Sequence, residues 1–427
     1  MRSRFLLGLV CGVALAVGAA GVLTYGPELM RTPVAQAKKR DKKGAQPSSK
    51  AQKTRLPNGR QLMPIRDGVY PQDFFPNTEK LGPNEMRIIA LGTGMPQVIQ
   101  KQTKASGWYV ELGNGDKFMF DLGTGTMENL AALQPDWSQV DTVFLSHLHS
   151  DHAGDFAPLY IGGWMNGRYT PLYIYGPTGS KPELGTKAFV ENQVKAWAWD
   201  IEGRKGSFPD AGGRALVKEF DYKKVQVIYD ENGVKVTQFP AIHALDGSVS
   251  FRMKWGKRSF VFGGDSAPNN WYIEHAKGAE VAVHECFYTP EGLANAMDIG
   301  MKEATYISSY VHTPPAGFGK IMSAVRPRLA VGYHIWPNPE YMNQTLHEVA
   351  KTYDGEYVQA TDLTVINVTD KQIVVRDAVV SELALPTGTT KEYLEAFRSE
   401  VDANSKITEY LSSERWKGFK PPPLPER

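Results

Sequence analysis

The chain has 427 residues, 42% of them hydrophobic and 22% charged, so it can bury a sizeable core as one large domain or two smaller ones. Its net charge of +2 conceals an asymmetry: residues 1–60 contain 12 Lys/Arg and 2 Asp/Glu, whereas the remainder contains 36 and 44. The acidic body disfavours nucleic acid as a partner. Only Cys286 lies outside the leader that contains Cys11, which excludes an internal disulfide or a cysteine-based zinc site in a processed chain.

The N-terminal segment combines two arginines with an apolar run from Phe5 to about Tyr25. This pattern is typical of an export signal, with Ala35–Ala37 as a small-x-small cleavage site. The run is also long enough for a single membrane anchor. We therefore expect residues 1–37 to be a signal peptide or anchor, and the basic residues 38–60 to be a disordered linker. The protein is then exported, periplasmic or anchored to the membrane.

Strand patterns begin near residue 86, in a body that we expect to span residues 80–380. Alternating or apolar runs predict strands or hairpins at 86–96, 106–126 (turning at Asn114–Gly115), 140–152, 171–177, 224–243, 248–265, 280–287, 328–337 and 363–378. Helical patterns occur at 128–133 and 185–200, and a Gly-rich loop at 206–213. Residues 381–427 are expected to form a helical extension, helical over 386–415, and a tail. Two packed sheets with helices outside, an α+β fold, would accommodate these elements.

The segment "FLSHLHSDHAGD", residues 144–155, places three of the chain's 9 histidines within six residues. His147, His149 and His152, with Asp151 between them, lie where a predicted strand passes into a loop. If strand geometry persists there, His147 and His149 point to the same side, and Asp151 and His152 can face a second position. Neutral imidazole and carboxylate are ligands that suit a borderline ion such as zinc.

This cluster resembles the H-x-H-x-D-H motif of the metallo-β-lactamase superfamily. Further residues in the expected order strengthen the resemblance: His243 in "FPAIHAL", Asp265 in "FVFGGDS" and His334 in "VGYHIWP" each follow an apolar run. The resemblance covers roughly residues 86–370 and implies a four-layer α-β-β-α sandwich.

The resemblance implies two divalent metal ions. One would be held by His147, His149 and His243 and the other by Asp151, His152 and His334, with Asp265 bridging them. Zinc is the expected metal, and the same ligands accept manganese or iron. In such centres a metal-bridging hydroxide is the nucleophile, and the ions stabilise charge that develops on the attacked group. Asp151 could orient this nucleophile as well as bind metal.

Within the superfamily the chain is most similar to ribonuclease Z and its arylsulfatase-like relatives. The segments that carry this similarity are "LGTGMP", "FDLGTGT", "YGPTG", "GGDSAP", "AEVAVHECF" and "VHTPPAGFGKIMSAVRPRLAVGYH". The resemblance assigns Glu285 and His312 to a proton-transfer pair. The alternative is that these two residues support the metal ligands.

The chain also departs from ribonuclease Z, because it has a leader, an acidic body and no recognisable basic arm. We therefore expect an exported hydrolase of small phosphodiester, sulfate or related esters, with a small-molecule substrate as its partner rather than nucleic acid. A ribonuclease Z-like 3′-tRNA processing endonuclease is the alternative, and a non-catalytic metal-dependent binding module is the third hypothesis. The resemblance also allows a homodimer.

Aromatic residues crowd segments that could cover the centre, and we expect some of them to form a pocket for an apolar ester. They are Trp164, Tyr169, Trp197, Trp199, Trp271, Phe287, Tyr288 and Trp336. Arg168 is a candidate contact for an anionic leaving portion. Outside the motifs, His284 is expected to be structural, and His275 and His347 to lie at the surface.

Overall fold

The computed structural model describes residues 68–96 and 103–381, all within the unit Lys53–Arg427. The leader, the linker, the expected helix at 386–415 and the tail lie outside the described residues. Among the described residues, no helix has the length and hydropathy needed to cross a lipid bilayer.

Within the described residues, fifteen strands form two mixed sheets, as expected from the many short apolar runs. The first sheet has the order β15-β14-β1-β2-β3-β4-β5-β6. Its strands are β1 (Met86–Gly92), β2 (Gly107–Leu112), β3 (Lys117–Phe120), β4 (Thr142–Phe144), β5 (Leu172–Pro177), β6 (Ala215–Phe220), β14 (Thr364–Val368) and β15 (Ile373–Asp377). Strands β15 to β3 pair antiparallel, whereas β3 to β6 pair parallel.

The second sheet has the order β13-β12-β11-β10-β9-β8-β7. Its strands are β7 (Gln226–Glu231), β8 (Val234–Pro240), β9 (Val249–Trp255), β10 (Arg258–Phe262), β11 (Val281–Glu285), β12 (Leu329–Tyr333) and β13 (Tyr357–Gln359). The predicted hairpins β2–β3, β7–β8 and β9–β10 are all present in antiparallel register. The sequence patterns missed β6 and β13, a half-exposed edge strand and a strand of three residues.

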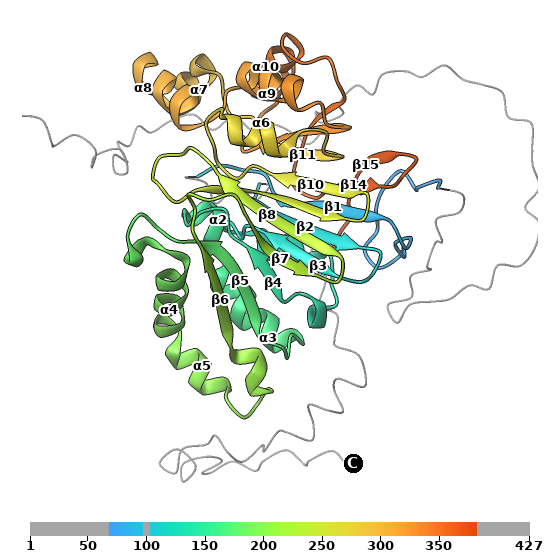
Figure 1. Ribbon diagram of the computed structural model, residues 1–427, viewed down its shortest axis with the longest axis vertical. Helices are drawn as coiled ribbons and strands as arrows, with labels where there is room; N and C mark the ends of the chain where they lie inside the picture. The colour runs from blue at the N-terminus through green and yellow to red at the C-terminus, as the bar shows by residue number, and fades with distance from the viewer. Residues whose placement is uncertain (1–67, 97–102, 382–427) are drawn as a thin grey trace, which may run out of the picture. The chain divides into compact units, whose positions relative to one another are not determined.

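The helices lie outside the sheets in two groups (Figure 1). Those on the first sheet's side are α1 (Thr126–Ala132), α2 (Ser150–Ala153), α3 (Gly163–Asn166), α4 (Thr186–Ala196) and α5 (Ala198–Arg204). Those on the second sheet's side are α6 (Asn270–Ala276), α7 (Pro290–Met297), α8 (Met301–Tyr306), α9 (Pro315–Val325) and α10 (Pro339–Ala350). The layers therefore run helix, sheet, sheet, helix, and the four-layer α-β-β-α prediction is confirmed.

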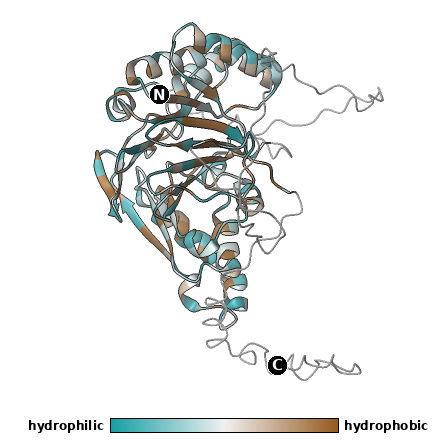
Figure 2. Ribbon diagram, turned by 90° about the vertical axis from the view of Figure 1, so that its right-hand side faces the viewer, coloured by the Kyte–Doolittle hydropathy of each residue, from teal (hydrophilic) through white to brown (hydrophobic). Residues whose placement is uncertain are grey.

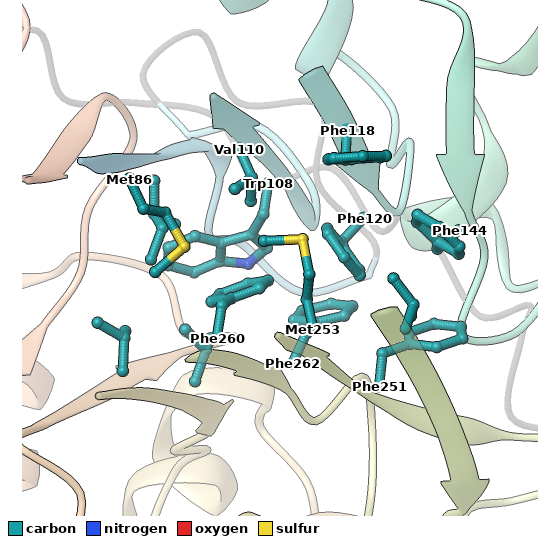
Figure 3. Close-up of a cluster of buried hydrophobic side chains, with 14 of the residues drawn as sticks. Met86, Trp108, Val110, Phe118, Phe120, Phe144, Phe251, Met253, Phe260 and Phe262 are labelled. Carbon is teal, nitrogen blue, oxygen red and sulfur yellow. The ribbon is translucent and has the colours of Figure 1, made fainter. Parts of the chain in front are cut away.

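The main core lies between the sheets, where aromatic side chains of both inner faces interdigitate (Figure 3). Phe120 stacks on Phe144 at 5.0 Å between ring centroids and meets Phe260 of the opposite sheet edge-on at 5.1 Å. All three are fully buried, and each such side chain contributes roughly 2 kcal/mol by leaving water. Figure 2 shows hydrophobic stretches along the central strands and mixed hydropathy on the helices. The inner faces thus fix how the two sheets pack.

Candidate metal centre

The candidate ligands all follow strand ends at one edge of the two-sheet core. The segment with His147–His152 follows β4, His243 follows β8, Asp265 follows β10 and His334 directly follows β12. Parallel strands bring their carboxyl ends to the same edge of a sheet, so loops far apart in sequence meet there. The structure brings all seven residues that the sequence singled out into one cluster.

Strand geometry does not persist through the histidine motif, because β4 ends at Phe144. His147 and His149 instead lie in the loop before the short helix α2. Their rings still converge, with His147 Nε2 3.0 Å from His149 Nδ1. The expected convergence of the two rings is therefore correct, although a loop rather than a continued strand produces it.

One group of ligand atoms comes from His147, His149, His243 and Asp265. His243 Nε2 lies 3.3 Å from His149 Nδ1 and 3.8 Å from Asp265 Oδ2. All four candidate atoms lie within 4.8 Å of one another. Three imidazoles and one carboxylate at this spacing match the donor set of a zinc-type ion.

A second group comes from Asp151, His152, Asp265 and His334. His152 Nε2 lies 3.1 Å from Asp265 Oδ1, and His334 Nε2 lies 3.2 Å from both Asp265 Oδ2 and Asp151 Oδ2. Asp265 is common to both groups, so its carboxylate lies between them. This is the position that the sequence comparison gave to the bridging ligand.

Hydrogen bonds at the outer ring nitrogens fix the orientation of three histidines. His152 Nδ1–H donates to Asp121 Oδ2 at 2.6 Å, and His243 Nδ1–H donates to the carbonyl oxygen of Val311 at 3.1 Å. His147 Nδ1 lies 3.1 Å from Ser146 Oγ, whose own hydrogen goes to Asp121. In a neutral ring a proton on Nδ1 leaves Nε2 with its lone pair, and in all three rings Nε2 faces the cluster.

Asp121, the residue after β3, organises this arrangement and was not singled out by the sequence analysis. Its carboxylate is fully buried and accepts from Ser146 N at 2.7 Å, Ser146 Oγ at 2.6 Å and His152 Nδ1. One carboxylate therefore positions two candidate ligands. The available signal was its place in "FDLGTGT", a polar residue directly after a buried strand.

Burial controls the protonation of the first group of histidines. It lowers the pKa of His147 well below the ordinary value and also lowers the pKa of His149. Burial lowers the pKa of His243 to about 3. These rings are therefore neutral near pH 7, which is the state that metal binding requires.

Neighbouring charges control the protonation of the second group. Burial by itself would lower the pKa of His152, but Asp265, Asp151 and Asp121 raise it well above the ordinary value. Burial would raise the pKa of Asp265, but His152 and His334 hold it well below the ordinary value. A metal cation bound between these carboxylates would neutralise the negative charge that otherwise raises the pKa of His152.

The unpaired polar atoms supply a test of whether this site fits a metal. Neither carboxylate oxygen of Asp265 makes a hydrogen bond of good geometry among the described residues, and the same holds for His152 Nε2, although all three atoms are buried and the nearest ring nitrogens lie 3.1–3.2 Å from the carboxylate. Buried polar atoms without partners are costly, at about 1–3 kcal/mol each. All three point into the cluster, so the residues fit divalent ions. The imidazole and carboxylate donors of the cluster accept zinc, manganese or iron without choosing among them.

Glu285 and His312, the second sequence-predicted pair, lie against the same cluster. His312 Nδ1 donates to Glu285 Oε2 at 2.6 Å, and Glu285 Oε1 accepts from the backbone nitrogen of Ser266. Phe287 stacks on the His312 ring at 4.2 Å. Burial raises the pKa of Glu285 well above its ordinary value, assisted by the charge of Asp265, and burial lowers the pKa of His312.

Backbone geometry marks the same region. His334 and Asp121 adopt positive φ angles of 71° and 61°, which cost non-glycine residues of order 1–3 kcal/mol each. Gly264, at φ 60°, passes so close to Ser146 that a Cβ would lie 2.7 Å from the serine Cβ. The backbone strain is therefore located where the loops that carry the candidate ligands converge.

Several residues expected near the substrate belong elsewhere. Arg168 is fully buried and donates to the carbonyl oxygens of Tyr160, Thr170 and Gly212, so its interpretation as a contact for an anionic group is wrong. Trp164 and Tyr169 pack in the core under the first sheet. These side chains are held by packing and by backbone carbonyls rather than facing the centre.

The remaining aromatic residues also differ from the expectation. Tyr288 and Trp336 pack together in a hydrophobic cluster with Phe287, whereas Trp197, Trp199 and Trp271 are exposed. Of the expected pocket residues, Phe287 contacts the cluster through His312.

The histidines outside the motifs are also placed. His284 is fully buried, as expected for a structural residue, and its Nδ1 bonds the carbonyl oxygen of Glu285. His347 is exposed on α10, whereas His275 is half-buried with its ring against Phe239, so only His347 matches the surface prediction.

Comparison with known proteins shows which families this chain is similar to. A model of the β-lactamase superfamily domain matches residues 116–335. Ribonuclease Z of Mycolicibacterium gilvum is 29% identical over 203 residues, covering 47% of this chain and 68% of that protein. Ribonuclease Z of Mycobacterium marinum is 28% identical over 203 residues, covering 47% and 70%.

A solved structure shares the fold. The metallo-β-lactamase fold protein YhfI from Bacillus subtilis superposes with a TM-score of 0.50 at 18% identity, covering 67% of this chain and 100% of that one.

Proposed function

The chain belongs to the β-lactamase superfamily as a metal-dependent hydrolase, and from this premise we propose that it is an exported enzyme that cleaves small phosphodiester, sulfate or related esters. The observation that carries the proposal is the convergence of ring nitrogens of His147, His152 and His243 on the buried carboxylate of Asp265. Two divalent ions, zinc in the first instance, would be held by the two groups that share this carboxylate. When bound, such ions activate water and stabilise negative charge on the attacked group.

The protein's own residues would orient the reactants and exclude bulk water. Asp151 is nearly fully buried, with Oδ2 within 3.3 Å of both His152 Nε2 and His334 Nε2. Its carboxylate can accept a hydrogen bond from the attacking water and so align it. Asp121, by holding Nδ1–H of His152, keeps that ring in the orientation the centre needs.

Glu285 and His312 would hold a proton and transfer it during the reaction. Burial favours the uncharged forms of both groups, so the 2.6 Å pair retains a proton to higher pH than an exposed carboxylate would. From the edge of the centre, the pair could pass that proton to a departing oxygen. The other role open to it is to hold His334, whose Nδ1 lies 3.6 Å from Glu285 Oε2.

A ribonuclease Z-like endonuclease is the second candidate function. The observation that favours it is the 28–29% identity to curated ribonucleases Z over 203 residues. The leader and the acidic body argue instead for export and a small substrate, because unprocessed tRNA is a cytoplasmic polyanion.

The test compares substrates side by side on the full chain loaded with zinc or manganese. An aryl sulfate, a bis-aryl phosphodiester and a precursor tRNA are offered to the wild type and to Asp151→Ala, with Asp230→Ala, exposed on β7, as the matched control. We expect turnover of a small ester, lost in Asp151→Ala and kept in the control. Cleavage of precursor tRNA alone would establish the endonuclease instead.

A topology measurement tests export independently of activity. Reporter fusions after residue 60 and at the C-terminus, one active only outside the cytoplasm and one only inside, locate the body of the protein. We expect signal from the external reporter at both positions, and signal from the internal one would contradict the proposal.

A further inference from the structure

A cavity of about 370 Å³ opens directly beside the first group of candidate ligands. His147, His149 and His243 form one side of it. Its volume lies within the range of small-molecule sites. An ester whose reacting group lies on the centre would therefore place a neighbouring substituent in this cavity, which we call the substituent pocket.

Three segments build the remaining walls. They are the chain that follows β5, the helix α4 and the loop before β9. Leu148, Leu184, Phe189 and Leu245 supply apolar surface, and the side-chain amides lining the pocket come from Asn192 and Gln193 on α4. The lining thus suits an apolar group that carries few hydrogen-bonding atoms.

Among the described residues, the charged side chains lining the substituent pocket, apart from its histidines, are Glu183 and Asp246, and neither a lysine nor an arginine of this part of the chain lines it. Lys181 and Lys187 flank Glu183 in sequence but are exposed and do not line the pocket. Two carboxylates without a lining cation disfavour an anionic occupant and favour a cationic one. A polyphosphate chain entering here would meet the same repulsion.

We infer that the substituent pocket selects esters whose larger substituent is apolar and either uncharged or cationic, with Glu183 and Asp246 as the residues that set this charge preference. The inference rests on the proposed function, because it concerns the substrate of the same centre. It narrows the substrate class beyond an ester of small size.

Three methyl aryl phosphates test it on the zinc-loaded full chain. Their aryl groups are 4-ethylphenyl, 4-(2-aminoethyl)phenyl and 4-(2-carboxyethyl)phenyl, which differ in charge at a distance from the phenol oxygen. The leaving groups therefore have nearly the same acidity. We expect kcat/KM to be lowest for the carboxylate, by roughly threefold to tenfold relative to the ethyl compound, as for exposed charges several ångströms apart.

Charge-reversal variants test whether Glu183 and Asp246 set the charge preference. The double variant Glu183→Lys/Asp246→Lys should raise kcat/KM for the carboxylate relative to the amine by at least tenfold. Glu191→Lys reverses an exposed charge on the same helix outside the pocket lining and serves as the matched control. The preference should also weaken between 50 mM and 500 mM salt, because exposed charges are screened.

A binding measurement separates failure of this inference from failure of the proposed function. Calorimetry uses 4-ethylbenzylphosphonate and 4-(2-carboxyethyl)benzylphosphonate, whose carbon–phosphorus bonds resist hydrolysis. If neither the phosphate esters nor the aryl sulfate is cleaved, but the ethyl phosphonate binds more tightly and the double variant reverses the order, the pocket inference stands and the hydrolytic proposal falls. If esters are cleaved without a charge preference, the pocket inference is overturned alone. If neither turnover nor selective binding occurs, both are overturned.

Discussion

Replacement of Asp121 by asparagine tests how the centre is assembled. The buried carboxylate accepts three hydrogen bonds, two from Ser146 and one from His152 Nδ1 at 2.6 Å. An asparagine has the same shape but one oxygen, so its NH₂ group would face at least one of these donors. If His152 adopts the other tautomer to relieve this conflict, its Nε2 acquires a hydrogen and can no longer ligate a metal.

The expected loss is selective for one ion. Removal of a carboxylate that orients a ligating histidine weakens metal binding by about 10–100-fold, which corresponds to about 1.4–2.7 kcal/mol. The loss should fall on the group containing His152 and Asp151. The group with His149 and His243 should be affected less, because Asp121 reaches only its His147, and only through Ser146 Oγ, whereas the Nδ1 partner of His243 is a backbone carbonyl oxygen.

Competition with a zinc chelator of known affinity, followed by metal analysis of the protein, measures this effect. The wild type should retain two zinc ions per chain at a chelator concentration where Asp121→Asn retains one. Asp141→Asn, which removes a largely buried carboxylate bonded to Thr142 and away from the cluster, is the matched control. Unfolding in excess chelator shows whether the substitution also destabilises the metal-free fold. Two ions of unchanged affinity in Asp121→Asn would refute the orienting role.

Three further predictions concern stability. Glu79→Ala should reduce the free energy of unfolding by roughly 3–5 kcal/mol in urea titrations, because it leaves the buried Arg376 without a carboxylate and the buried Arg87 with Glu111 alone. A loss below 1 kcal/mol would contradict this. Burial lowers the pKa of His284 to about 4, so the unfolded chain takes up a proton first as pH falls below 6.5. The stability of the metal-free wild type should therefore fall by roughly 3 kcal/mol more than that of His284→Asn between pH 7 and pH 4, and parallel profiles would exclude the effect. Gly264→Ala should lower both zinc content and melting temperature, because its Cβ would meet Ser146; Gly278→Ala, at a similar φ of 64° with open space around its Cβ, measures the backbone strain alone.

The local pattern of apolar and polar residues was sufficient to predict much of the fold. Alternation and apolar runs predicted the strands that pack into the two inner faces, because burial on one side imposes a period of two. The turn at Asn114–Gly115 is correct for the same local reason: that pair favours a tight hairpin. The pattern failed at β6, which lies at a sheet edge and whose first five residues are half-buried or exposed. An edge strand that buries few of its side chains does not need an alternating apolar pattern, so its sequence does not reveal it.

The sequence singled out His147, His149, Asp151 and His152 by their spacing after a strand, and the family resemblance added His243, Asp265 and His334. What the sequence left open was their convergence, since strand order within a sheet depends on pairings between distant segments. The roles of Asp121 and Arg168 show this most clearly. One is a buried carboxylate that positions His152, and the other is a guanidinium bonded to backbone carbonyls. Neither partner set could be inferred from neighbours in the chain.

The sequence by itself determined which reactive side chains the protein offers: histidines and aspartates at strand ends, an acidic body, and a single cysteine beyond the predicted leader. Only the tertiary structure decided how that chemistry is arranged. Stacking of the two sheets brought the ends of β4, β8, β10 and β12 to one edge and placed Glu183 and Asp246 together in the wall of the substituent pocket. The physical reason is that local periodicity reports burial, whereas the direction and the neighbour of a buried polar group are set by packing across the whole core.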